Sequence, residues 1–241
     1  MFKLKNFPAA EYILLAKSLI NRAEYNNDDW VEKYSDAPDY SDLTHEERNK
    51  EAERLQGVYE NKLEELVENL EDRDINIQQF EQFVHELTER YILLVFLVGS
   101  ALTIPQIRRE ARNLIDEQIE IALESSRELG DRILAGQYRS WDGNPPQRSL
   151  SNLFAVWGGV LATAYQFGIL FYKKAREMLR WDIGEAEHCA TCLRLNKQIH
   201  PRWKWRIRLL HPKSRILDCG GWRCKCKFTP VPEDTPERGS Y

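Results

Sequence analysis

The chain has 241 residues, 42% hydrophobic and 30% charged, which excludes a disordered chain and fits a soluble protein with a core. Its formal net charge of −4 conceals two oppositely charged parts. Residues 1–137 carry 16 Lys and Arg against 29 Asp and Glu, whereas residues 138–241 carry 18 against 9. We therefore expect a polyanion to bind only the second part of the chain.

Helical periodicity dominates the first part of the chain. A short amphipathic helix is predicted over residues 9–24, and residues 26–42 read as a linker or surface arm. Thr44 and Glu47 form a capping-box pattern that predicts the start of a long helix. The apolar stripe of this helix repeats every three or four residues, at Ala52, Leu55, Tyr59, Leu63, Leu66 and Leu70. A second helix is predicted over 76–98, with its apolar last turns buried on all sides.

Pro105, preceded by Thr103 as a cap, predicts the first turn of a third helix. Gly130 or Gly136 is expected to end this helix, and residues 141–147 (WDGNPPQ) read as a turn. The predicted inner face of the third helix consists of Ile107, Ala111, Leu114, Ile115, Ile119, Ala122 and Leu129.

A fourth long helix is predicted over residues 149–179, and it contains 23 residues without a formal charge, from Leu150 to Tyr172. That length could span a bilayer. Polar residues and three glycines interrupt the run, so a buried core helix is favoured over a membrane span. The prolines beyond residue 230 predict an extended tail.

Five cysteines fall within 38 residues, an odd number that favours a metal site in a reducing compartment over a secreted disulfide framework. Zinc takes four soft ligands in a tetrahedron. The two halves of the segment together predict one closed zinc site from the cysteines Cys189, Cys192, Cys219, Cys224 and Cys226. The preferred ligands are Cys189, Cys192, Cys219 and Cys224, with Cys226 as a substitute and His188 and His211 as outside candidates. Disulfides and free buried thiols are the alternatives.

A closed four-ligand site leaves no coordination position for water or substrate, which favours a folding staple over a catalyst. A module of about 48 residues needs such a staple because its own core is small. The helical part has no phosphate-binding glycine loop, no nucleophile elbow and no HExxH pattern. An enzyme would need an open metal site beside a base such as Glu185 or Glu187. We therefore expect a protein that binds and does not catalyse.

Basic and aromatic residues alternate between the cysteine pairs. Cations beside flat rings suit phosphate contact and base stacking. The favoured alternative is that tryptophans at a spacing of two pack one face of a strand, while the cations form a solvated face or bind an acidic protein. The candidate nucleic-acid or partner-binding residues are Arg202, Trp203, Lys204, Trp205, Arg206, Arg208, Trp222 and Arg223.

Residues 184–195 (GEAEHCATCLRL), preceded by Arg180 and Trp181, resemble the C-terminal signature of the phage Mu F-type minor head proteins, the phage head-morphogenesis family. The closing motif, residues 219–226 (CGGWRCKC), is also similar, with Lys225 where arginine is more usual. A weaker similarity includes Gln118 and the helix end at residues 134–140, so that the resemblance covers about residues 105–230.

The resemblance implies a low-copy virion component inside the phage head, present in the host cytoplasm during assembly. Its implied partners are the portal and capsid proteins and packaged DNA, with no membrane partner. The alternative is a zinc-containing nucleic-acid-binding protein. The expected fold is mainly α, a multi-helix elongated body with a small zinc-stapled α+β or irregular C-terminal module. The expected units are an N-terminal helix and arm (1–43), a helical body (44–180), a Cys-rich module (181–230) and an extended tail (231–241).

Overall fold

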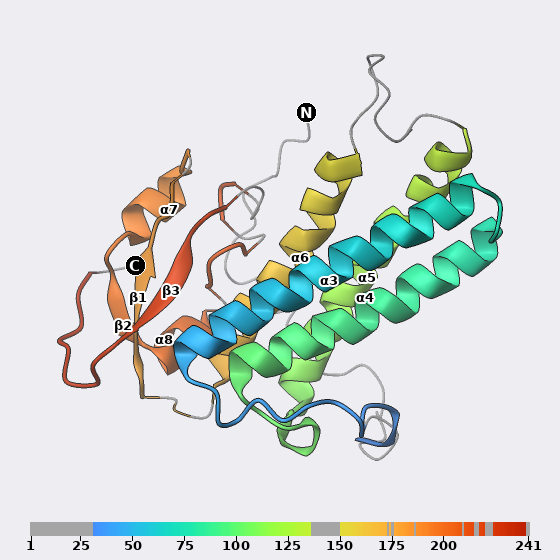
Figure 1. The fold of residues 1–241 in the computed structure, drawn as a ribbon. Helices are drawn as coiled ribbons and strands as arrows, with labels where there is room; N and C mark the ends of the chain where they lie inside the picture. Colours follow the sequence, from blue (N-terminus) through green and yellow to red (C-terminus); the bar gives the residue numbers. More distant parts are fainter. Residues whose placement is uncertain are drawn as a thin grey trace.

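The computed structural model describes residues 31–135, 150–172, 174, 176–185, 187–208, 210–214, 217–219 and 224–239. In this part the chain is mainly helical and carries a small three-stranded antiparallel sheet. Long helices lie side by side, and the sheet lies beside one end of them (Figure 1). The predicted helix over 9–24 and the turn over 141–147 lie outside the described residues.

The first long helix, α3 (His45–Glu71), begins where the capping box predicts. The backbone N–H of Glu47 donates to Thr44 Oγ1 at 3.3 Å, and the Glu47 carboxylate accepts from the Thr44 N–H at 2.8 Å. Most of the predicted stripe is buried, but Val67 takes the place of Leu66, which is only partly buried. The helix therefore buries one face, as its periodicity indicates.

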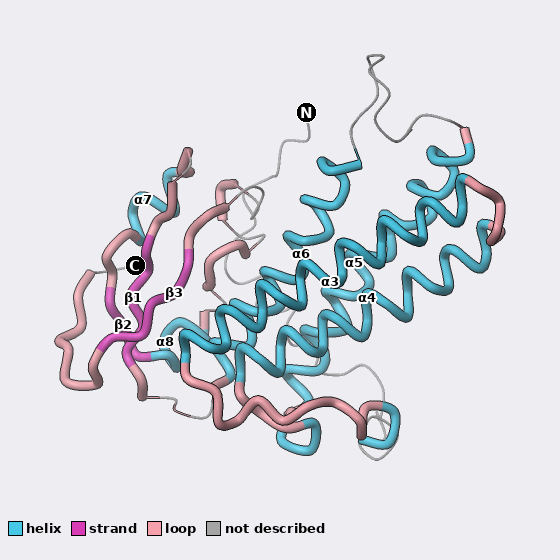
Figure 2. Tube along the Cα trace, in the orientation of Figure 1, coloured by secondary structure: helices cyan, strands magenta, loops and turns pink. Residues whose placement is uncertain are grey.

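Helix α4 (Ile77–Ser100) is the centre of the helical body, because it packs against α3, α5 and α6. Asn76 caps it through a second capping box with Gln79. Every residue from Tyr91 to Ser100 is buried, as the apolar sequence predicts. Figure 2 shows α3, α4 and α5 running alongside one another.

The third predicted helix begins later than expected. Pro105 lies in a short 3-10 turn, η1 (Ile104–Gln106), and helix α5 runs from Arg109 to Leu134. The prediction that Gly130 ends the helix is wrong, because α5 continues through it. A Cβ atom there would lie 2.1 Å from Ile77 Cδ1, so a larger residue would require the Ile77 side chain, at the start of α4, to move. Gly136 lies outside the described residues.

Helix α6 (Leu150–Phe171) ends eight residues before the predicted end at Leu179. From Met178 the chain is extended and forms β1 (Met178–Asp182). The prediction fails here because β1 is stabilised by pairing with strands that are distant in the sequence. Among the described helices, none is long and apolar enough to cross a membrane.

The sheet has the order β2-β1-β3, with β2 (Ile199–Pro201) and β3 (Lys227–Val231) antiparallel to the central β1. Two short helices, α7 (Ala190–Leu195) and α8 (Arg202–Ile207), accompany it. Three buried aromatic rings form the centre of this module, with centroids 5.3–5.7 Å apart: Trp181, Trp205 and Phe228. These rings form an edge-to-face and tilted cluster of the kind that aromatic residues favour.

The segment predicted as an extended tail is folded back in its described part. β3 continues to Val231, and the chain then turns at residues 233–234. Arg238 exchanges two backbone hydrogen bonds of 2.9 Å with Ile199 at the outer edge of β2. The prolines therefore do not keep this segment away from the module, and it covers an edge that would otherwise be open.

Candidate metal centre

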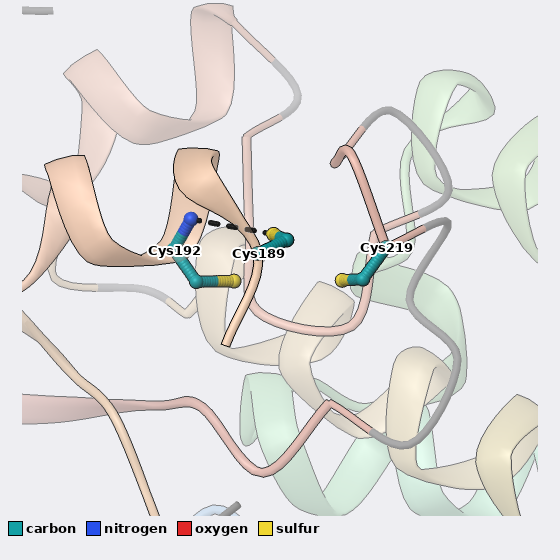
Figure 3. Close-up of side chains that lie close together, drawn as sticks. All are labelled: Cys189, Cys192 and Cys219. Carbon is teal, nitrogen blue, oxygen red and sulfur yellow. Dashed lines mark hydrogen bonds between the residues drawn. The ribbon is translucent and has the colours of Figure 1, made fainter. Parts of the chain in front are cut away.

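The first pair of candidate ligands is set by the turn that begins α7. Cys189 is the N-cap of this helix, and its Sγ accepts a hydrogen bond from the Cys192 N–H at 3.4 Å (Figure 3). The extended backbone at Cys189 and the helical turn after it place the two sulfurs within 4.8 Å of each other. This is the local geometry that a zinc knuckle requires.

The second half of the segment contributes its cysteines to the same cluster through two separate stretches of chain. Asp218 accepts hydrogen bonds from the N–H and the hydroxyl of Thr191 at 2.8 and 2.6 Å, which holds Cys219 beside α7. Cys224 and Cys226 lie immediately before β3. Two distant stretches of chain therefore converge on one cluster.

The five sulfurs form two triads that share Cys192. In the outer triad, Cys189, Cys192 and Cys219, all ligand atoms lie within 4.8 Å of one another. The inner triad, Cys192, Cys224 and Cys226, meets the same limit. The inner triad is buried, whereas Cys189 and Cys219 are only partly buried. All five cysteines are free thiols, and together they could hold a metal ion.

The thiols influence one another strongly because they are crowded. The hydrogen bond from Cys226 lowers the pKa of Cys224 to about 5, and the same bond raises the pKa of Cys226. Burial and the hydrogen bond to Cys189 raise the pKa of Cys192. Although burial opposes it, hydrogen bonds from Cys192 and Cys219 lower the pKa of Cys189. The pKa values of Cys189 and Cys224 are thus lowered and those of Cys192 and Cys226 raised, and a bound cation would favour the thiolate form of all four.

One distance between sulfurs of the cluster is compatible with a tetrahedral zinc site. A tetrahedral site with Zn–S bonds of about 2.3 Å places its sulfurs about 3.8 Å apart. The Sγ atoms of Cys192 and Cys224 are 4.0 Å apart. A buried group of thiols also matches the soft ligands that zinc prefers. The preferred ligand set of Cys189, Cys192, Cys219 and Cys224 takes members from both triads, and it stays a prediction.

The two histidine candidates have different surroundings. His211 lies outside both triads: its ring packs edge-on against Phe167 with centroids 4.8 Å apart, and its Nδ1 lies 2.8 Å from the carbonyl oxygen of Pro212. Full burial lowers its pKa to about 4. His188 instead lies at the edge of the inner triad, with its Nδ1 3.8 Å from Cys226 Sγ. Glu185 and Glu187 are exposed, and the metal-competent groups found among the described residues contain cysteines only.

The basic aromatic segment does not form the predicted strand. Residues 202–207 are α8, and side chains two apart on a helix point to nearly opposite sides. Trp205 is therefore fully buried and donates from its indole N–H to the Leu179 carbonyl at 3.2 Å, whereas Trp203 is 40% exposed. The prediction that the tryptophans contribute to the core holds for Trp205, through a helix and not through a strand face.

The cations of this segment are partly engaged within the protein. Arg202 is 1% exposed and forms an ion pair with Glu177. Lys204 pairs with Glu237, and the Arg206 guanidinium lies 5.6 Å from the Phe171 ring. Arg208 is exposed. Trp222 and Arg223 lie outside the described residues. Arg202 and Trp205 are thus part of the core and cannot contact a nucleic acid.

One contact of the module is not predictable from the sequence. The guanidinium of Arg48 from α3 and that of Arg202 lie 4.2 and 4.8 Å from the centre of the Tyr172 ring, at the end of α6. Arg48 is buried and also donates to the Gly99 carbonyl at 3.4 Å. This contact joins the module to the helical body. No local pattern reveals it, because a single arginine in a charged helix is ordinarily exposed.

No family model matches the chain, and no protein of curated function and no solved structure matches it either. The resemblance to head-morphogenesis proteins therefore rests on the motifs within residues 180–226 and on the weaker helical similarity before them.

Proposed function

We propose that the chain is a non-catalytic minor head protein of the phage head-morphogenesis kind, with a zinc-stapled module mounted on a helical body. The observation that carries this proposal is the meeting of five cysteines from two separate stretches, residues 189–192 and 219–226, in one cluster. These stretches are also the ones whose motifs resemble the head-morphogenesis signature.

The zinc ion would serve as a cross-link. Four residues, drawn from the five clustered cysteines and the neighbouring His188, would hold it, and it would tie α7 to the chain that leads into β3. With four protein ligands the ion has no position for water or substrate. The module has few apolar side chains beyond its aromatic centre, so a metal cross-link supplies stability that its core alone lacks.

The helical body would bind the portal and capsid proteins. Its α3 helix buries one face in the body and presents exposed glutamates along the other, including Glu53, Glu64 and Glu68. Such a face suits a partner with a basic surface. The module, in the basic part of the chain, would lie nearer to packaged DNA.

The test is association with virion components. The tagged full chain is expressed with the portal and major capsid proteins encoded beside it, and mature virions are analysed by mass spectrometry. The proposal expects co-purification with the portal or capsid protein and a few copies per virion. Absence from virions together with no binding to either protein would overturn it.

The nucleic-acid-binding alternative is separated by its salt dependence. Contacts with several phosphates would make the affinity for DNA fall steeply between 50 and 200 mM salt. The head-protein proposal expects weak DNA binding by the isolated chain, because Arg202 and Trp205 are buried.

A further inference from the structure

The loop before α7 lies directly against the chain that carries the inner triad. A Cβ atom at Gly184 would be 2.5 Å from the carbonyl oxygen of Lys225, the residue between Cys224 and Cys226. Only a glycine allows this approach without a shift of the backbone. The contact sets Gly184 beside the chain that carries Cys224 and Cys226.

His188 is held at this place in one tautomer. Its Nε2 lies 2.7 Å from the carbonyl oxygen of Gly184, and a carbonyl can only accept, so Nε2 carries the hydrogen. The other ring nitrogen, Nδ1, then has a free lone pair, and it is the atom 3.8 Å from Cys226 Sγ. Histidines that bind metals are usually fixed in this way, by donating the other ring N–H to a carbonyl or carboxylate.

The inner triad lacks one ligand for a closed zinc site. In a tetrahedral site a nitrogen and a sulfur ligand lie about 3.5 Å apart and two sulfurs about 3.8 Å. The observed 3.8 Å between His188 Nδ1 and Cys226 Sγ, and 4.0 Å between the sulfurs of Cys192 and Cys224, are close to these values. His188 lies near Cys226 but not within 4.8 Å of all three sulfurs, so zinc binding requires its ring to move toward the rest of the triad. Three thiolates also leave one negative charge less beside the zinc ion than four would, which favours a buried site.

We propose that the zinc ion is held by Cys192, Cys224, Cys226 and His188. The inference rests on the proposed zinc staple and names its ligands. Cys189 and Cys219 are then not required for binding. Cys189 keeps a separate role as the N-cap of α7, where its sulfur accepts the Cys192 N–H.

The test uses the purified full chain loaded with zinc or with Co²⁺. X-ray absorption at the zinc edge counts sulfur and nitrogen neighbours directly, and the visible spectrum of the Co²⁺ form reports the same set. The expected result is three sulfurs and one nitrogen. His188→Gln should weaken zinc binding by more than about 100-fold, beyond the loss typical of an outer-shell change. The matched control, His85→Gln on the exposed face of α4, should change neither measurement.

A second variant keeps the test independent of whether His188→Gln folds. The double variant Cys189→Ser, Cys219→Ser should retain zinc and the unaltered Co²⁺ spectrum. Four sulfurs in the native protein, or loss of zinc from the double variant, would overturn the ligand assignment while leaving the zinc staple in place. A native chain that binds no zinc would instead overturn the proposed function itself.

Discussion

The helical body and the C-terminal module are stabilised in different ways. The body buries long apolar stripes, and the end of α4 from Tyr91 to Ser100 is enclosed by three other helices. The module has short strands, short helices and one cluster of three aromatic rings. We therefore expect the hydrophobic effect to be sufficient for the body, and the module to depend on its cysteine cluster and on its attachment to α6.

The largest difference should appear when the metal is removed. Cys192→Ser should unfold the module and leave most of the helical signal, because Cys192 is the cysteine common to both triads and metal binding by small domains contributes roughly 10 kcal/mol or more. Circular dichroism and limited proteolysis would follow the two parts. Serine at Cys219, which is only partly buried, should have a smaller effect. Equal unfolding of body and module in Cys192→Ser would show that the two are not separate in stability.

The joint between the two parts should be the next most sensitive place. Arg202→Met removes a buried cation and leaves Glu177 unpaired, so we expect a loss of about 3–5 kcal/mol in the free energy of unfolding. Adding Glu177→Gln to this variant should recover part of the loss, since the partly buried carboxylate of Glu177 is then no longer left without its cation. Denaturant unfolding of the two variants would measure it. A single variant as stable as the native chain would mean that the ion pair contributes nothing to the joint.

Within the helical body, stability should be most sensitive to substitutions where α4 and α6 cross. A Cβ atom at Gly168 would lie 2.4 Å from the Phe96 carbonyl oxygen, so Gly168→Leu should cost about 3 kcal/mol by forcing the helices apart. Gly57 in α3 is the matched control, because nothing lies within 4 Å of a Cβ atom there. Gly57→Ala should instead stabilise α3 by about 0.5–1 kcal/mol. Thermal unfolding of the two variants would measure the expected loss of stability in Gly168→Leu and the expected gain in Gly57→Ala. A destabilised Gly57→Ala would contradict the packing described.

The smallest expected effect concerns pH. Burial holds the pKa of His211 at about 4 in the folded chain, below its ordinary value of about 6.5. The unfolded chain therefore binds more protons between these values, and stability should fall by roughly 2–3 kcal/mol as the pH drops from 6.5 to 4. His211→Phe should make this dependence shallower, because phenylalanine cannot titrate. Acid would release any bound metal from the native chain and from His211→Phe alike. The difference between their profiles of stability against pH therefore isolates the contribution of the histidine. Identical profiles would show that His211 does not contribute.

The elements that the sequence predicts well are those with local causes. The capping box at Thr44 and the stripe of α3 are readable because both depend on residues three or four apart. The cysteine cluster is equally readable, since paired spacings are a chemical signature in themselves. Local patterns are therefore enough for α3 and α4 and for the candidate ligands.

Prediction from the sequence fails where contacts between residues distant in the sequence determine the structure. Met178–Asp182 forms a strand instead of extending α6, because two other strands pair with it. The orientation of His188 depends on its bond to the Gly184 carbonyl, which no residue spacing reveals. The burial of Arg202 depends on Tyr172 and Glu177, which belong to other elements.

The most direct test of the whole account is the metal content of the purified full chain, kept under reducing conditions and measured by mass spectrometry of its elements together with a count of reactive thiols. The account predicts one zinc ion per chain and slow thiol modification until a chelator is added. A folded chain that contains no zinc and whose five thiols react at once would contradict it.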